Sequence, residues 1–131
     1  MVHKIFISYA TGDEDHIKEL HDELFKLGNI EVYIPEWDRV ADVNLKSKIK
    51  EGINSCSVLI VLLTYNSTNT IWLNQEIGYA TARNIPIIPI IEQGLDVRGF
   101  LEGKDYFIFK RGDFRYNIQQ VIARLQSILY Q

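Results

Sequence analysis

The uninterrupted apolar run Val58–Leu63 is the feature that most constrains the fold of this chain. A strand that packs on one face alternates apolar and polar residues, whereas a strand covered on both faces is apolar throughout. Ser57 precedes the run, and the turn-prone residues 64–69 follow it. The run therefore predicts a strand inside a parallel sheet that carries helices on both sides.

Strand-like runs alternate with helical patterns along the whole chain. We predict strands at residues 5–9, 30–34, 58–63, 85–91 and 106–109 and helices at residues 11–27, 44–53, 70–84 and 114–129, with residues 95–101 forming a short helix or an irregular crossover. Because strands that alternate with helices are joined by right-handed crossovers, the sheet should be parallel. Five strands in a single domain of residues 1–131 fit an α/β flavodoxin-like fold with strand order 2-1-3-4-5.

Two local signals make narrower predictions. Thr11 and Glu14 have the spacing of a capping box, with Thr11 as the N-cap of the first helix and Glu14 bonding back to it. Pro89 lies inside the fourth strand, and it lacks the N–H group that a strand between two neighbours donates. Pro89 is therefore unexpected if the fourth strand has a neighbour on each side.

Composition bounds the class of protein and its partners. Apolar residues make up 47% and charged residues 24% of the chain, as in a globular domain, and the net charge of −3 disfavours binding to nucleic acid. The lone Cys56 excludes an intrachain disulfide and a cysteine metal cluster, and His3, His16 and His21 have no metal-ligand spacing, so we predict no metal site. The sequence shows no signal peptide or membrane span, so we expect a cytoplasmic protein without a membrane partner.

Trp72 and Glu76 form the strongest candidate site. They follow the third predicted strand, and ligands bind at the carboxyl ends of the strands in open parallel sheets. Because they are four residues apart, they share one face of the predicted helix. A carboxylate beside a large flat ring at that edge indicates chemistry on a sugar. The plainer alternatives are that Glu76 is a solvated residue on an exposed helix face and that Trp72 caps the core.

Two further segments supply candidate substrate-binding residues. Tyr9, Ala10 and Thr11 lie at the end of the first strand, where backbone N–H groups at the start of the next helix could meet a pyrophosphate. Trp37 and Asp38 lie in the polar loop after the second strand, where the indole could cover a bound nucleotide or contact another protomer. The chain has no Gly-x-Gly-x-x-Gly pattern, so a Rossmann-type dinucleotide site is not predicted.

Several of these residues match a known family. Residues 4–9, Lys-Ile-Phe-Ile-Ser-Tyr, resemble the first signature box of Toll/interleukin-1 receptor (TIR) domains. The loop at residues 35–43 sits where that family has its variable loop. Trp72 and Glu76 resemble the Trp and the catalytic Glu of the TIR domains that consume NAD+. The similarity covers nearly the whole chain, which looks like a stand-alone prokaryotic TIR domain.

The resemblance implies an NAD+ nucleosidase. It would release nicotinamide and produce ADP-ribose or a cyclic ADP-ribose isomer as a signal in antiviral defence and innate immunity, with Glu76 as the catalytic residue. NAD+ would then be the substrate, so no cofactor is expected, and TIR–TIR contacts would make a second copy of the chain its protein partner. Nicotinamide leaves as a neutral ring and needs no proton donor, so the usual pair of glycosidase carboxylates can shrink to one.

Two other functions stay open at this stage. One is a TIR domain without catalytic activity that signals only through homotypic contacts, for which NAD+ would stay intact. The other is an enzyme resembling nucleoside 2-deoxyribosyltransferases, which have the same type of sheet and direct a carboxylate at a glycosidic bond. Transfer of deoxyribose between free bases would reveal that activity.

Overall fold

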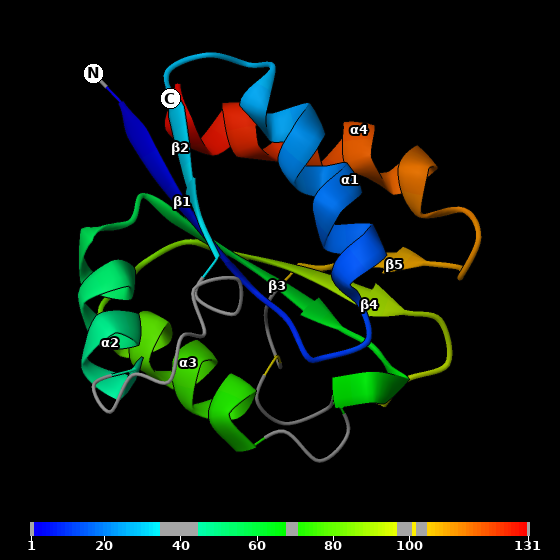
Figure 1. Ribbon diagram of the computed structural model, residues 1–131, viewed down its shortest axis with the longest axis horizontal. Helices are drawn as coiled ribbons and strands as arrows, with labels where there is room; N and C mark the ends of the chain where they lie inside the picture. Colours follow the sequence, from blue (N-terminus) through cyan, green and yellow to red (C-terminus); the bar gives the residue numbers. More distant parts are fainter. Residues whose placement is uncertain (1, 35–44, 68–70, 97–100, 102–104, 131) are drawn as a thin grey trace.

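Five parallel strands form one sheet in the order β2-β1-β3-β4-β5, which confirms the predicted flavodoxin-like topology (Figure 1). The computed structural model describes residues 2–34, 45–67, 71–96, 101 and 105–130. The strands are β1 (His3–Ser8), β2 (Ile30–Tyr33), β3 (Val58–Leu63), β4 (Ile87–Glu92) and β5 (Phe107–Phe109). The helices are α1 (Glu14–Phe25), α2 (Leu45–Ser55), α3 (Ile71–Ala82) and α4 (Phe114–Leu129), with a 3₁₀ turn at Tyr65–Ser67.

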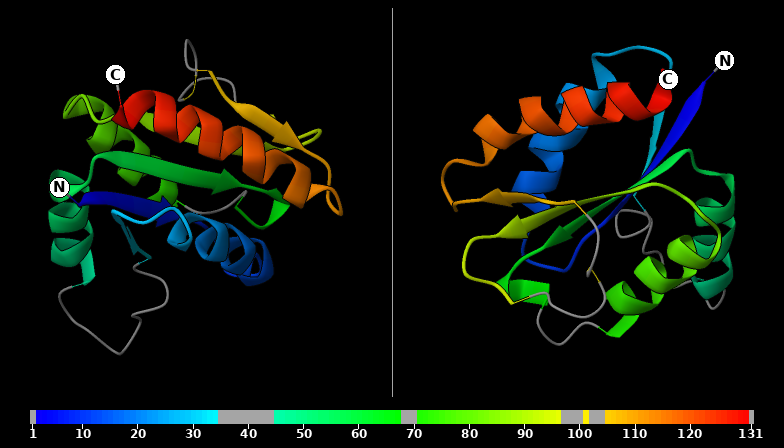
Figure 2. Two further views of the ribbon diagram at one scale, coloured as in Figure 1. Left: turned by 90° about the horizontal axis from the view of Figure 1, so that it is seen from above. Right: turned by 180° about the vertical axis from the view of Figure 1, so that it is seen from behind.

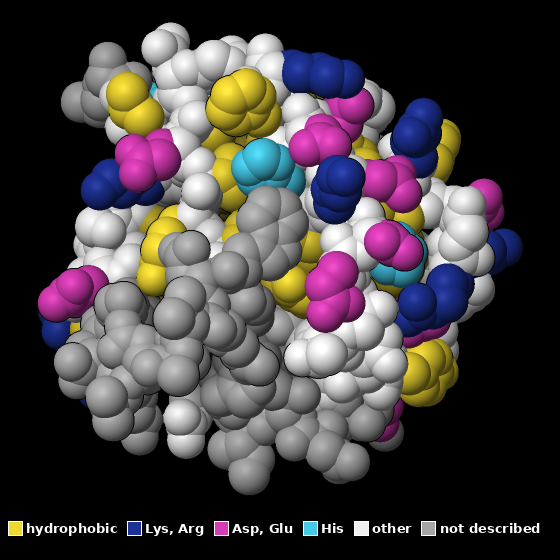
Figure 3. Space-filling model, viewed as in Figure 1, with side chains coloured by type: hydrophobic (Ala, Val, Ile, Leu, Met, Phe, Trp, Pro, Cys, Tyr) yellow, Lys and Arg dark blue, Asp and Glu magenta, His cyan; other side chains and the backbone are white. Residues whose placement is uncertain are grey.

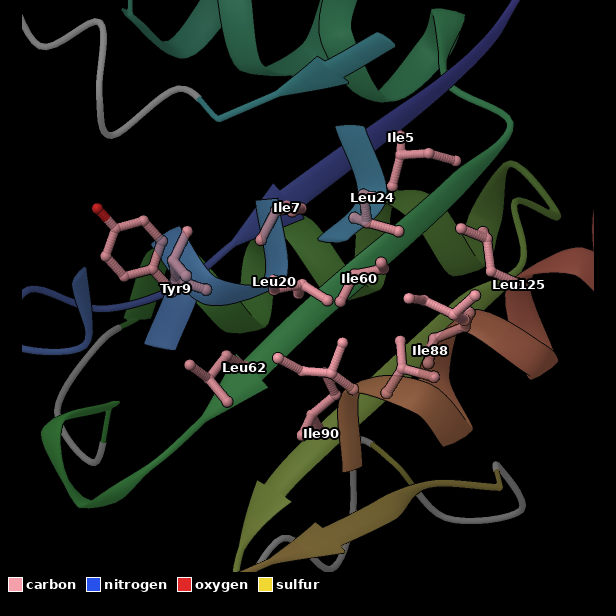
Figure 4. Packing of buried hydrophobic residues seen from close by; sticks show 14 of the residues in the cluster. Ile5, Ile7, Tyr9, Leu20, Leu24, Ile60, Leu62, Ile88, Ile90 and Leu125 are labelled. Carbon is pink, nitrogen blue, oxygen red and sulfur yellow. The ribbon is translucent and has the colours of Figure 1, made fainter. Parts of the chain in front are cut away.

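The helices cover the two faces of the sheet in pairs, α1 with α4 on one side and α2 with α3 on the other (Figures 1 and 2). All six residues of β3 are buried, as the apolar run predicts. Its side chains alternate between two cores: Ile60 and Leu62 pack toward α1 and α4 (Figure 4), while Leu59 and Val61 pack toward α2 and α3. This alternation decides on which face of the sheet each functional side chain lies.

The start of α1 differs from the predicted capping box. The N-cap residue is Asp13 rather than Thr11, and its side chain makes no capping hydrogen bond. Thr11 is exposed in the preceding turn, which Gly12 makes possible by adopting a φ of +110°. Glu14 does bond backward, accepting from the N–H of Gly12 at 2.9 Å. The helix therefore begins two residues later than the capping box predicts, and the buried carboxylate of Asp13 accepts hydrogen bonds from Thr64 and Asn66 instead of capping the helix.

Pro89 fits inside β4 because of its place in the hydrogen-bond pattern. The N–H of Leu59 donates to the carbonyl of Pro86 at 2.9 Å, and alternate residues along β4 therefore turn their backbone groups toward β3. By this alternation Pro89 faces the opposite side, toward β5. Among the described residues, the pairing of β4 with β5 begins only at Ile90, opposite Phe107. The missing N–H therefore breaks no bond in either ladder.

Helix α2 packs closely against the sheet at Gly52. A Cβ atom at that position would lie 2.7 Å from Cε2 of Phe6 and 2.9 Å from Cε1 of Tyr33. These two rings pack on each other with centroids 5.3 Å apart. The absence of a side chain at Gly52 therefore sets the distance between α2 and β1. Within the described part of the chain, no helix combines the length and apolar character needed to cross a membrane.

Candidate functional site

Glu76 lies beside the carboxyl end of β1, bonded to the last residue of that strand. The hydroxyl of Ser8 donates a hydrogen bond to Oε2 of Glu76. Ser8 is fully buried and Glu76 is 4% exposed. A buried carboxylate carries a large desolvation cost unless hydrogen bonds compensate it. The arrangement excludes the alternative in which Glu76 is a solvated residue on an exposed helix face.

The packing of α3 directs Glu76 toward the sheet. Ile77 and Ala80 belong to the core between the sheet and α2 and α3, where they join Leu59 and Val61. These contacts fix the rotation of α3 about its axis, and Glu76 then points to the carboxyl edge. Trp72 lies on the same helix four residues earlier. Its backbone position shares a face with Glu76, while its side chain lies outside the described part of the structure.

The other predicted site residues are divided between locations. Ala10 is buried in the core on the same face of the sheet as Glu76. Tyr9 is buried in the core of the opposite face, between the sheet and α1 and α4 (Figure 4). Thr11 is exposed in the turn before α1. Trp37 and Asp38 lie outside the described residues.

A second group of polar side chains meets at the same edge of the sheet, on the face of α1 and α4. We call it the carboxyl-edge cluster; it consists of Asp13, Thr64, Asn66, Glu92 and Arg111. The Thr64 hydroxyl donates to Oδ2 of Asp13 at 2.6 Å, and the Asn66 amide donates to Oδ1 at 3.0 Å. Arg111 donates to both carboxylate oxygens of Glu92, at 2.8 and 3.0 Å. The cluster therefore joins the end of β4 to the connections that follow β1, β3 and β5.

Electrostatics within the cluster favours the charged state of both partners. The hydrogen bond from Arg111 holds the pKa of Glu92 below its usual range, although burial acts in the opposite direction. The same bond raises the pKa of Arg111. Arg111 also lies 3.5 Å from Oδ1 of Asp13, which is fully buried. The guanidinium group therefore lies close to two carboxylates, one at the end of β4 and one just before α1.

Sequence reasoning missed Ser8 as the partner of Glu76 and missed the whole cluster. Its five members lie at or after the carboxyl ends of four strands, and local sequence patterns do not connect them. The predicted strand order could have found them, because parallel strands bring their carboxyl ends to one edge. Within the described residues, no group of three or more His, Cys, Asp or Glu side chains is placed to hold a metal ion.

Two surface hollows lie away from Glu76. One of about 650 Å³ is at the amino ends of β4 and β5, where Ile87, Tyr106 and Arg124 are among its lining residues. The other, of about 700 Å³, is lined by residues of α1 and α4 that include Glu23 and Arg115. Acidic and basic side chains are interspersed over α1 (Figure 3). This viewed face therefore has no continuous basic surface among its described residues.

Solved structures share the fold at low sequence identity. The TIR domain of the Toll-related receptor TRR-2 from Hydra magnipapillata superimposes with a TM-score of 0.72 at 18% identity, covering 92% of this chain and 94% of that one. The CMP N-glycosidase BcmB from Clostridium botulinum superimposes with a TM-score of 0.66 at 18% identity, covering 91% and 98%. These likenesses establish the architecture alone.

Sequence comparison places the chain in a family. A curated relative is a probable 3′ cyclic ADP-D-ribose synthase, ThsB′, from Bacillus cereus (strain MSX-D12), which is 27% identical over 104 residues. That alignment covers 72% of this chain and 53% of the relative, so the chain spans about half the length of the relative. Residues 5–125 match the TIR domain family. The chain therefore belongs to the TIR domain family.

Proposed function

We propose that this chain cleaves the bond between nicotinamide and ribose in NAD+ and produces ADP-ribose or a cyclic ADP-ribose isomer. The observation that carries the proposal is the buried carboxylate of Glu76, held by Ser8 at the carboxyl edge of the sheet. Membership of the TIR family and the name of the Bacillus cereus relative support it. A role in antiviral defence and a cytoplasmic location belong to the same proposal.

The reaction needs few groups from the protein. When the N-glycosidic bond breaks, its electron pair stays on nicotinamide, which leaves as a neutral ring. The ribose becomes an oxocarbenium ion, and the negative charge of Glu76 stabilises it. Water then adds to the anomeric carbon and releases a proton, which gives ADP-ribose. A hydroxyl of the adenosine ribose that adds in place of water gives a cyclic product, and a site that excludes water favours this outcome.

NAD+ consumption by purified protein tests the proposal. The parent, Glu76→Gln and Glu76→Ala are incubated with NAD+ over a wide range of protein concentrations, and the products are separated by chromatography and identified by mass. We expect both variants to lose on the order of 10³-fold in rate, because they remove the main stabilising charge. Glu31→Gln, which neutralises an exposed carboxylate on β2, is the matched control and should keep the parental rate.

A catalytically inactive interaction domain is the second candidate. The observation in its favour is the 4% exposure of Glu76, which leaves a substrate little access to the carboxylate in this conformation. Intact NAD+ at every protein concentration, together with self-association of the parent, would support this second function and contradict the first. Thymidine with free adenine is included as a parallel substrate pair, because exchange of the base would identify a deoxyribosyltransferase.

A further inference from the structure

We propose that Ser8 is a positioning residue that aims the Glu76 carboxylate at the anomeric carbon. This inference rests on the proposed cleavage of NAD+ and extends it to a residue that does not touch the reacting atoms. Three features of the structure support it. They are the rigid attachment of Ser8, the number of rotatable bonds in the Glu76 side chain, and the directions taken by the hydroxyl groups of Thr64 and Ser67.

Ser8 is fixed by the sheet itself. It is the last residue of β1, and it pairs in register with Val61 of the fully buried strand β3. Ser8 is 0% exposed. A serine side chain has one rotatable bond before its hydroxyl group, so the donor has little freedom once the strand is placed. The hydroxyl of Ser8 is therefore a fixed reference point at the carboxyl edge.

The side chain of Glu76, by contrast, has more rotatable bonds than that of Ser8. Its carboxylate is joined to α3 through three rotatable bonds, and packing of Ile77 and Ala80 fixes the helix but not those bonds. A hydrogen bond to an ionised acceptor is roughly twice as strong as one between neutral groups. The bond from Ser8 can therefore select one rotamer of Glu76 at little entropic cost to the donor. Misplacement of a catalytic group by about 1 Å can cost about 10²-fold in rate.

The neighbouring hydroxyl groups point elsewhere. The Thr64 hydroxyl, which follows β3, donates to Asp13 in the carboxyl-edge cluster. The Ser67 hydroxyl accepts from the N–H of Thr64 at 3.1 Å. The Ser8 hydroxyl group, unlike these two, donates to Glu76. Its role differs from that of the cluster, which lies on the other face of the sheet.

Substitutions at Ser8 separate positioning from folding. Ser8→Cys keeps nearly the same volume and replaces the hydroxyl with a weak donor, and Ser8→Ala removes the donor. We expect both to lower kcat for NAD+ cleavage by about 10- to 100-fold while KM stays within about twofold, because binding contacts are kept and alignment is lost. Ser8→Thr retains a hydroxyl and should recover most of the parental kcat.

Asn117→Ala is the matched control for stability. The Asn117 amide donates to the carbonyl of Ile108 at 2.9 Å and to Oε1 of Gln120 at 3.2 Å. Asn117 is 7% exposed on α4, so this variant also loses partly buried side-chain hydrogen bonds. It lies on the face of the sheet opposite to Glu76. We expect its melting temperature to fall about as far as that of Ser8→Ala while its kcat equals that of the parent.

The outcomes distinguish the two proposals. If the parent cleaves NAD+, Glu76→Gln does not, and both Ser8→Ala and Ser8→Cys match the parental kcat, the role of Ser8 is wrong and the proposed function stands. Equal losses of kcat in Asn117→Ala and Ser8→Ala would show a merely structural role and would also overturn the inference. If the parent leaves NAD+ intact at every concentration, the proposed function fails, and the role of Ser8 fails with it.

Discussion

The lack of a side chain at Gly52 allows α2 to pack closely against β1. Glycine inside a helix normally costs about 0.5–1 kcal/mol relative to alanine. Gly52 is an exception in which the space is already filled, because ring atoms of Phe6 and Tyr33 occupy the place of a Cβ atom. Aromatic rings in a packed core have few alternative positions, so the neighbours cannot yield cheaply.

Alanine substitutions at two helical glycines should therefore change stability in opposite directions. Gly52→Ala should lower the free energy of unfolding by about 1–3 kcal/mol through overpacking. Gly78→Ala should raise it by up to about 1 kcal/mol, because a Cβ atom at Gly78 meets no atom of the described residues within 4 Å. Urea unfolding followed by circular dichroism measures both changes. An increase in the free energy of unfolding for Gly52→Ala would show that α2 can move away from the sheet at little energetic cost, and would contradict this prediction.

The candidate site shows what residue patterns reveal. Glu76 could be predicted because a helical carboxylate after a buried strand falls on a known ligand edge. Its partner Ser8 could not, since a serine at the end of a strand has no distinctive spacing from residue 76. Tyr9 was predicted beside Ala10 as a binding residue, yet alternation along the strand sends their side chains to opposite faces. Neighbours in sequence are separated by the sheet itself.

At the scale of elements, the carboxyl-edge cluster joins the end of β4 to three connections that lie far apart in the sequence. Arg111 follows β5 and is 47% exposed, yet it reaches Glu92 at the end of β4 and Asp13 before α1. Because the pair is partly exposed, its contribution is smaller than that of a fully buried ion pair. Loss of the guanidinium would nevertheless leave two buried carboxylates with fewer donors.

Substitutions of Arg111 and Arg115 test whether an ion pair in the cluster stabilises the fold more than a surface ion pair does. Arg111→Met should lower the free energy of unfolding by about 1–2 kcal/mol, because the carboxylate of Glu92 stays buried. Arg115→Met should change it by less than about 0.5 kcal/mol, since Arg115 is 87% exposed and lies 3.6 Å from Glu19. Equal effects from the two substitutions in urea unfolding would mean that the cluster adds no more stability than an ordinary surface pair.

The elements themselves were largely predictable. Bounds such as those of β3 and α4 agree with the sequence pattern because long apolar periodicities define them. The start of α1 could not be predicted from local sequence. Asp13 is bonded to Thr64 and Asn66, which lie in a connection some fifty residues later. A local rule for helix capping fails when a tertiary contact recruits the capping side chain.

At the scale of the whole molecule, Glu92 links stability to pH. Its pKa is lowered from 4.5 in the folded state, so the folded protein binds a proton less readily than the unfolded chain. The ionised pair with Arg111 therefore contributes stability above about pH 5, and this contribution is lost as pH falls through the folded-state pKa. Arg111 stays protonated throughout this range.

Replacement by glutamine should expose this dependence. At pH 7, Glu92→Gln should unfold with a free energy about 1 kcal/mol below that of the parent, because the charge-assisted bonds are replaced by weaker ones. The difference should shrink as pH falls below about 4.5, since the parent then loses the same charge. Urea titrations at several pH values measure it. A difference that is constant down to about pH 3 would rule out the linkage.

The position of Pro89 in β4 disfavours pairing of this strand with another chain. The segment Ile87–Glu92 is almost entirely apolar and rich in isoleucine, a composition that favours stacking between chains. Its first half pairs with β3 alone among the described strands, and the other side borders an open hollow. A strand from another chain that paired there would face the amide nitrogen of Pro89, which has no hydrogen to donate. Pro89 therefore removes one donor that a further strand pairing on this side of β4 would need.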